Sequence, residues 1–205
     1  MVFPGSPIEW YFRAFAPDRS CLRLAYASIV GQFKGIHVLV ESLSHLKRMG
    51  VPFRCEIAGD QVDTELLEKL KEFLAHHELS DCVDFIGFQD KAGLASLFAR
   101  SNVLVFPSVF EEPFGKTQIE AMAAGLLVVS SGTGGTREIV QHGENGLVFD
   151  SGNAESLAAE LKSLVDNEDR WRQLAANGQS SAFNFTTKRS VDKLEEIFDS
   201  LLERE

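Results

Sequence analysis

Short apolar runs alternate with amphipathic segments along most of this chain, and this alternation constrains the fold more than any other feature. The runs that predict strands cover residues 21–28, 53–58, 83–86, 103–106, 126–130 and 145–149. The segments that predict helices cover residues 35–49, 63–79, 90–99, 113–125 and, more briefly, 136–141, with helix again from 154 to the end, broken near 167 and 183–187. Strands that alternate with helices form parallel sheets covered on both faces. We therefore predict an α/β fold: a single Rossmann-like domain with a six-stranded parallel sheet and helices on both faces.

Ligands of such sheets bind beyond the carboxyl ends of the strands. The loops expected to carry function are therefore residues 28–35, 59–60, 87–89, 107–116 and 131–135. We expect residues 31–34 to be plain loop.

The stretch from residue 103 to residue 125 combines a buried strand, a loop with two acids and the start of a helix. The first amides of a helix lack partners within it, and the helix dipole favours an anion there. Gly115 has no side chain, so a phosphate can approach its backbone closely. Glu120 can accept hydrogen bonds from ribose hydroxyls, and Glu112 can bind hydroxyls of the group that a diphosphate carries. The stretch predicts a nucleotide-sugar site.

These residues also carry a family resemblance. Glu112 and Glu120 are separated by seven residues, with Pro-Phe-Gly after the first and Ala-Met-Ala-Ala-Gly after the second. This pattern resembles the signature of the group 1 retaining glycosyltransferases, which have the two-domain GT-B architecture. The resemblance implies the C-terminal, donor-binding half, with Glu120 on the ribose and Glu112 on the transferred sugar. Further donor contacts are then expected from the residues around the helix start: Phe114, Gly115, Lys116 and Thr117.

Lys34-Gly35, after the first strand, matches the lysine-glycine of this family's phosphate loop. The resemblance gives Lys34 the role of neutralising the departing diphosphate, although most lysines are simply solvated. The family usually has an arginine five residues earlier, where this chain has Ile29. We hypothesise that Lys116 or Arg137 supplies the missing charge.

The resemblance also places the nucleotide base near residues 86–88, mainly on the main chain of Gly87 and Phe88. Gly134-Gly135 matches a family segment beneath the donor, for which a structural role as a tight turn is the stronger interpretation.

Composition excludes several other classes of function. Thirty acids against 20 bases give a net charge of −10, which argues against nucleic acid as the main partner. Three widely spaced cysteines, Cys21, Cys55 and Cys82, are expected to be buried thiols in a reducing compartment. No membrane span or signal peptide is apparent, so we expect a cytoplasmic protein whose membrane contact, if any, runs through another domain. Neither the histidines nor the acids suggest a metal, and no cofactor is expected besides the donor substrate.

Residues 1–19 resemble the linker between the two domains of this family, or form an ordinary N-terminal extension whose aromatics, Trp10, Tyr11 and Phe12, cover the core. Residues 20–205 then form the nucleotide-sugar domain. The acceptor would bind an N-terminal domain of the same parent chain, and the isolated domain would transfer little. Two alternatives remain: a non-catalytic nucleotide-sugar-binding module, which Ile29 favours, and a GT-B-type epimerase or phosphorylase.

Overall fold

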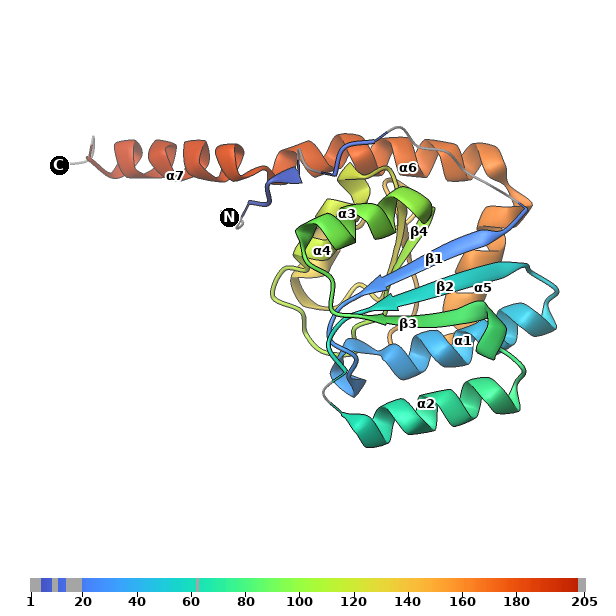
Figure 1. The fold of residues 1–205 in the computed structure, drawn as a ribbon. Helices are drawn as coiled ribbons and strands as arrows, with labels where there is room; N and C mark the ends of the chain where they lie inside the picture. The colour runs from blue at the N-terminus through green and yellow to red at the C-terminus, as the bar shows by residue number, and fades with distance from the viewer. Residues whose placement is uncertain (1–4, 9–10, 14–19, 62, 203–205) are drawn as a thin grey trace.

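The computed structural model describes residues 5–8, 11–13, 20–61 and 63–202 of the 205-residue chain, and its sheet confirms the predicted architecture (Figure 1). Six parallel strands lie side by side in the order β3-β2-β1-β4-β5-β6. The strands are β1 (Leu22–Ala27), β2 (Phe53–Ala58), β3 (Val83–Gly87), β4 (Val103–Phe106), β5 (Leu127–Ser130) and β6 (Leu147–Val148). The α-helices are α1 (Ile36–Arg48), α2 (Thr64–His76), α3 (Lys91–Arg100), α4 (Lys116–Ala123), α5 (Ala154–Asp166), α6 (Glu168–Ala182) and α7 (Thr187–Leu202).

Helices α2 and α3 begin one residue later than predicted because an Asp caps each of them. Asp63 and Asp90 accept hydrogen bonds from the amides of Leu66 and Gly93 at the starts of α2 and α3. Asn167, at the predicted break, caps α6 in the same way. Short polar side chains before a helix satisfy amides that have no partner within it. The cap residues thus stand just outside the helices that they start.

Several details of the sequence prediction were wrong. The helix predicted to end at residue 79 ends at His76, and the helix predicted from residue 113 begins at Lys116. The loop 31–34 contains a 3₁₀ turn, η2 (Gln32–Lys34), and the short helix expected at 136–141 is a 3₁₀ turn, η4 (Gly134–Glu138). The last strand is shorter than 145–149, because the backbone amide of Asn145 donates to the carbonyl oxygen of Gln141 in the preceding turn. The Asn145 side chain holds the same turn through the amide of Gln141 and the carbonyl oxygen of Ile139. Of the three thiols only Cys55 is fully buried, whereas Cys21 and Cys82 are partly exposed.

Each face of the sheet has its own core. Leu22, Leu24 and Tyr26 of β1 point to the face that α1, α2 and α5 cover. The intervening Ala25 and Ala27 point to the other face, which α3 and α4 cover. This alternation with period two is what a strand buried on both sides requires.

The strand order reverses between β1 and β4. The two strands are hydrogen-bonded neighbours although the chain forms β2 and β3 between them. β1 leads into α1 on one face and β4 leads into α4 on the other, so the loops that follow them diverge. Doubly wound sheets bind ligands at such a point.

The N-terminal segment packs on the face that carries α3 and α4. Ile8 and Tyr11 are buried there, and the Tyr11 ring lies 5.7 Å from that of Phe98, so this aromatic does cover the core. Phe12 is half exposed, and Trp10 lies outside the described residues. The interpretation of residues 1–19 as an interdomain linker stays a prediction. In the part of the chain that the structure describes, none of the helices has the length and apolar character needed to cross a bilayer.

Candidate functional site

The start of α4 lies at the carboxyl end of β4, and Gly115 shapes it. Gly115 has a left-handed φ of 82° immediately before the helix. A Cβ at this position would lie 2.4 Å from Gln118 Nε2 and 3.2 Å from Thr136 Cγ2. Backbone conformation and space therefore both require glycine here. The helix start is left as a set of backbone donors suited to an anion.

Lys34 and Glu112 meet beside this helix start. Lys34 ends η2, in the loop after β1, and Glu112 lies in the loop after β4. Lys34 Nζ lies 2.6 Å from Glu112 Oε2, and the two side chains are 26% and 12% exposed. Ser108 Oγ donates a second, longer hydrogen bond of 3.4 Å to the same oxygen. The structure thus joins the two residues that the sequence assigned to diphosphate and sugar.

Backbone contacts lock the loops after β1 and β4 together. The amide of Val109 donates to the carbonyl oxygen of Phe33 at 3.0 Å, and Ser108 Oγ donates to that oxygen at 3.2 Å. Gly35 has a φ of 69°, and a Cβ there would lie 1.8 Å from the carbonyl oxygen of Pro107. The glycine after Lys34 is needed for the loops to approach, and this approach positions the lysine.

The glycine turn after β5 packs against the backbone of Glu112. The amide of Gly135 donates to the carbonyl oxygen of Glu112 at 2.8 Å. A Cβ at Gly134 would lie 2.4 Å from that oxygen, and one at Gly135 would lie 2.3 Å from the carbonyl oxygen of Pro113. These contacts agree with the structural role predicted for this pair.

Glu120 lies within α4, whereas Glu112 precedes the start of that helix. The Glu120 side chain is partly buried. Its Oε1 accepts a hydrogen bond of 2.8 Å from Ser6 Oγ in the N-terminal segment. Burial raises the pKa of the Glu120 carboxyl, and the Ser6 hydrogen bond and the charges of Lys116 and Lys91 oppose that rise. The carboxylate is held by its neighbours rather than fully solvated.

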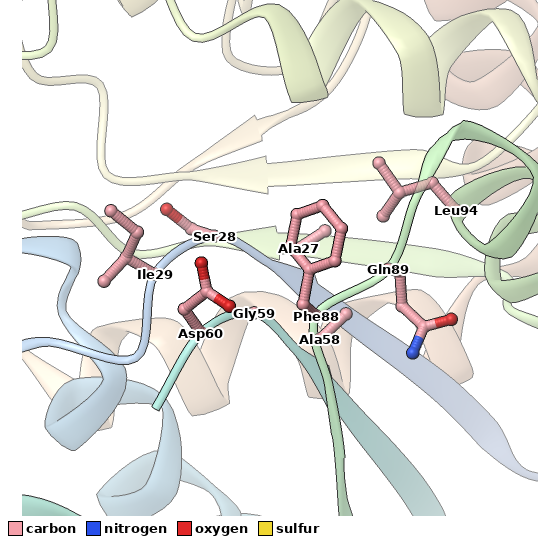
Figure 2. A pocket seen from close by; sticks show the side chains of 9 residues that line it. All are labelled: Ala27, Ser28, Ile29, Ala58, Gly59, Asp60, Phe88, Gln89 and Leu94. Carbon is pink, nitrogen blue, oxygen red and sulfur yellow. The ribbon is translucent and has the colours of Figure 1, made fainter. Parts of the chain in front are cut away.

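A pocket of about 190 Å³ opens at the carboxyl ends of β1, β2 and β3 (Figure 2). In this view the Phe88 ring lies between Asp60 and Gln89, with Ile29 at one end of the pocket and Leu94 at the other. Its lining is Ala27, Ser28, Ile29, Ala58, Gly59, Asp60, Phe88, Gln89 and Leu94. A smaller hollow beside it shares Ala27 and Ser28 and is also lined by Lys34. The pocket therefore adjoins the Lys34–Glu112 pair.

Ile29, at the position of the family arginine, is half exposed in this pocket. Its carbonyl oxygen accepts a 2.7 Å hydrogen bond from Tyr26 Oη, which fixes the backbone there. Of the two proposed substitutes for the arginine, Arg137 donates through Nε to the carbonyl of Gly132 in its own turn. The charge of Lys116 acts on Glu120. That Lys116 or Arg137 replaces the arginine stays a prediction.

The remaining residues of the predicted site lie around these groups. The Phe114 ring is buried, 6.0 Å from that of Phe185, so its main chain is the part able to face a ligand. Thr117 is partly buried in the first turn of α4. Gly87 has a φ of 70° where β3 ends, and its carbonyl oxygen accepts a hydrogen bond from the Gly59 amide.

The sequence analysis did not identify Ser108 and Ser6, whose hydroxyls bond to Glu112 and Glu120. Ser108 could have been noted, because it follows the β4 strand directly. Ser6 has no local signal, since its partner is 114 residues away in the sequence. Asp60 was named only as a loop residue. Within the described ranges, no three side chains of His, Cys, Asp or Glu gather as metal ligands would.

Comparisons with known proteins agree with the fold described above. The family model of glycosyl transferases, group 1, matches residues 16–181. An uncharacterized glycosyltransferase of Methanocaldococcus jannaschii is 27% identical over 179 residues, which are 86% of this chain and 48% of the relative. The chain thus spans about half the length of that relative.

Solved structures share the fold. Alr3699/HepE of Anabaena, solved in complex with UDP and glucose, superimposes with a TM-score of 0.85 at 23% identity, over 97% of this chain and 56% of that one. The C-terminal domain of LpcC, a glycosyl transferase group 1 family protein of Francisella tularensis, gives a TM-score of 0.77 at 20% identity. That match covers 88% of this chain and 97% of that domain.

Proposed function

The chain belongs to the group 1 glycosyl transferases, and on this premise we propose that it binds a nucleoside-diphosphate hexose for retaining, metal-independent transfer of the sugar. The observation that carries the proposal is the contact of Lys34 with Glu112 beside the start of α4. This contact lies where the strand order reverses between β1 and β4. A lysine, free helix amides and a carboxylate at one point suit a diphosphate that carries a hydroxyl-rich group.

In the proposed complex the diphosphate lies over the start of α4, with Lys34 on its oxygens. Negative charge grows on the diphosphate as it leaves, and a positioned ammonium and helix amides stabilise that charge. Glu112 accepts hydrogen bonds from the hexose, and Glu120 accepts them from the ribose. The base lies against the main chain of Gly87 and Phe88, and the Phe88 side chain lines the pocket in Figure 2.

We propose UDP as the first nucleotide to test, ahead of GDP and ADP. HepE, with the same fold, has been solved with UDP-glucose as well as with UDP. The shared fold supports this choice, because base contacts expected mainly from the main chain leave the side chains near Gly87 and Phe88 uninformative about the base.

We also propose that the acceptor binds a second, N-terminal domain, which the longer relatives have room for. Helix α7 supports this proposal, since it projects from the body of the molecule (Figure 1). It carries an exposed apolar stripe formed by Val191, Leu194, Ile197, Phe198 and Leu201. An exposed stripe of this kind marks an interaction surface. We also propose a cytoplasmic location, as the wide spacing of the three cysteines predicts.

A non-catalytic donor-binding module is the second candidate, and Ile29 is the observation that favours it. An apolar side chain half exposed in the pocket replaces a cation that the family usually directs at the diphosphate. Such a protein would bind a nucleotide sugar without lowering the barrier to its transfer.

Calorimetric titration with UDP, GDP and ADP and their hexose conjugates tests the binding step. We expect Lys34→Ala and Glu120→Gln each to weaken binding by about tenfold or more. Lys69→Ala, an exposed lysine on α2, is the matched control. Absence of binding for all three nucleotides, or equal losses in the control, would refute the proposal.

Sugar transfer by a parent chain that includes the N-terminal domain then separates an enzyme from a binder. An enzyme loses transfer in Glu112→Ala, whereas a module shows no transfer even before substitution.

A further inference from the structure

Ser6 joins the N-terminal segment to the candidate ribose-binding carboxylate. Its side chain is 1% exposed, and its hydroxyl donates to Glu120 Oε1 at 2.8 Å. A carboxylate can accept about four hydrogen bonds, so this contact leaves room for two ribose hydroxyls. A buried hydrogen bond of this length fixes the orientation of the carboxylate on α4.

The backbone of Ser6 is tied to the junction between α6 and α7. Its amide donates to the carbonyl oxygen of Phe185 at 2.9 Å, and Ser6 pairs with Thr186 in a parallel bridge. A Cβ on Gly5 would lie 2.3 Å from the Cα of Thr187, so the two segments are in direct backbone contact. The N-terminal segment is thus held by the junction of α6 and α7 and contacts Glu120 through Ser6.

Burial and the groups around Glu120 act in opposite directions on the ionisation of its carboxyl. Burial raises the pKa of its carboxyl, and three groups favour its ionised form: the Ser6 hydroxyl, Lys116 on α4 and Lys91 on α3. From the N-terminal segment Tyr11 also faces it, and burial together with the Glu120 charge raises the pKa of Tyr11 to about 12. The phenol therefore stays neutral at physiological pH. An ionised carboxylate is a pure acceptor at both oxygens, whereas a protonated carboxyl carries a donor hydrogen on one of them.

We propose that Ser6 is a positioning residue for nucleotide binding, which orients Glu120 toward the ribose and couples this carboxylate to the junction of residues 5–8 with 185–187. The inference rests on the proposed function, because the ribose contact of Glu120 belongs to it. Displacement of the junction moves Ser6 and weakens nucleotide binding, although none of the junction residues contacts the nucleotide.

The test uses the 205-residue chain with UDP, GDP and ADP as probes. Ser6→Ala is compared with Ser6→Thr, which keeps the hydroxyl, and with Ser190→Ala as the matched control. Ser190 Oγ donates to the carbonyl oxygen of Thr186 at 3.1 Å, so that control loses a hydroxyl at the same junction but away from Glu120. Calorimetry gives the dissociation constant between pH 5 and 8. A carbon-detected NMR titration of the ligand-free chain gives the pKa of Glu120.

We expect Ser6→Ala to weaken binding of the nucleotide by about tenfold, as for the loss of a hydrogen bond to a charged group. We also expect it to raise the pKa of Glu120, because the Ser6 hydrogen bond favours the ionised form. On acidification the carboxyl is then protonated, and binding lost, at a higher pH than in the unsubstituted chain. Ser6→Thr should restore most of both properties. A purely structural role for Ser6 would lower the melting temperature without moving the pKa or the pH at which binding is lost.

Three results would overturn the inference. An unchanged Glu120 pKa in Ser6→Ala removes its physical basis. An equal loss of binding in Ser190→Ala without any change in the Glu120 pKa makes the effect one of general packing. Loss of binding in Glu120→Gln but not in Ser6→Ala refutes the role of Ser6 and leaves the proposed function standing. If Glu120→Gln binds all three nucleotides normally, the proposed ribose contact itself is wrong.

Discussion

The Lys34–Glu112 contact makes a prediction that separates nucleotide binding from sugar binding. In the ligand-free site the Glu112 carboxylate pairs with the Lys34 ammonium group, which a bound diphosphate would also contact. A diphosphate must therefore share Lys34 with Glu112 and also approach a negative charge. We predict that Glu112→Gln binds UDP more tightly than the unsubstituted chain does.

The size of the effect follows from the geometry of the pair. Coulomb's law gives about 4 kcal/mol for two charges 4 Å apart at an effective dielectric constant of about 20, whereas exposed pairs contribute a net ~0–1 kcal/mol. The N–O distance is 2.6 Å and the side chains are 26% and 12% exposed, so this pair lies between those limits. An estimate of about 1 kcal/mol corresponds to about fivefold tighter binding.

The matched control is Glu111→Gln. Glu111 is the adjacent acid in the same loop, is exposed, and contributes the same change in net charge. Calorimetry with UDP and with UDP-glucose then gives four comparisons. We expect Glu112→Gln to gain affinity for UDP but to gain less for UDP-glucose, because the hexose loses a charged acceptor.

An unchanged or weaker affinity for UDP in Glu112→Gln would contradict this reasoning, and so would an equal gain in Glu111→Gln. The first result would mean that Lys34 does not face the diphosphate. The second would mean that only the net charge of the loop matters.

Three further substitutions test the site and the packing around it. Ile29→Arg should fold with an unchanged melting temperature, because the side chain is half exposed, and should bind UDP about tenfold more tightly; unchanged affinity in calorimetry would show that this position does not face the phosphates. Gly35→Ala brings a Cβ to 1.8 Å from the Pro107 carbonyl oxygen at a φ of 69°, so it should cost at least ~1–3 kcal/mol in urea unfolding and lose UDP binding, and an unperturbed midpoint would contradict the predicted clash. Gln118→Met replaces a buried amide without a hydrogen-bond partner among the described residues and should stabilise the fold by about 1 kcal/mol, whereas a lower melting temperature would show that the amide has a partner.

The fold was predictable from the sequence because the periodicity and the length of apolar segments depend on residues that are close together in the chain. Apolar runs of four to eight residues alternate with amphipathic segments, which is typical of a parallel sheet, and the bounds predicted for β4 match the structure. The errors occurred where side chains compete with the backbone. Asn145 bonds to the turn before it and so shortens β6, and the glycines before Thr136 tighten the expected helix into the 3₁₀ turn η4.

The site was predictable in part for the same reason. Gly35 and Gly115 mark backbone conformations that few other residues adopt, so the sequence shows where two loops meet and where a helix begins. The direct contact between Lys34 and Glu112 could be expected only through the family resemblance, because 78 residues separate them. Ser6 was beyond prediction, since a serine in a proline-containing segment has no local pattern that identifies a distant carboxylate.

The two ends of the proposed donor site are therefore stabilised differently. At the diphosphate end, glycines and backbone hydrogen bonds hold the loops after β1 and β4, so the position of Lys34 changes little without breaking the fold. At the ribose end, Glu120 depends on one hydroxyl from the N-terminal segment, which itself is held by the junction of α6 and α7. A force on α7 or on the N-terminal segment should then alter the ribose contact before it alters the diphosphate contact. In a two-domain transferase such an arrangement would let the position of the partner domain adjust donor affinity through Glu120 while Lys34 and the start of α4 stay in place.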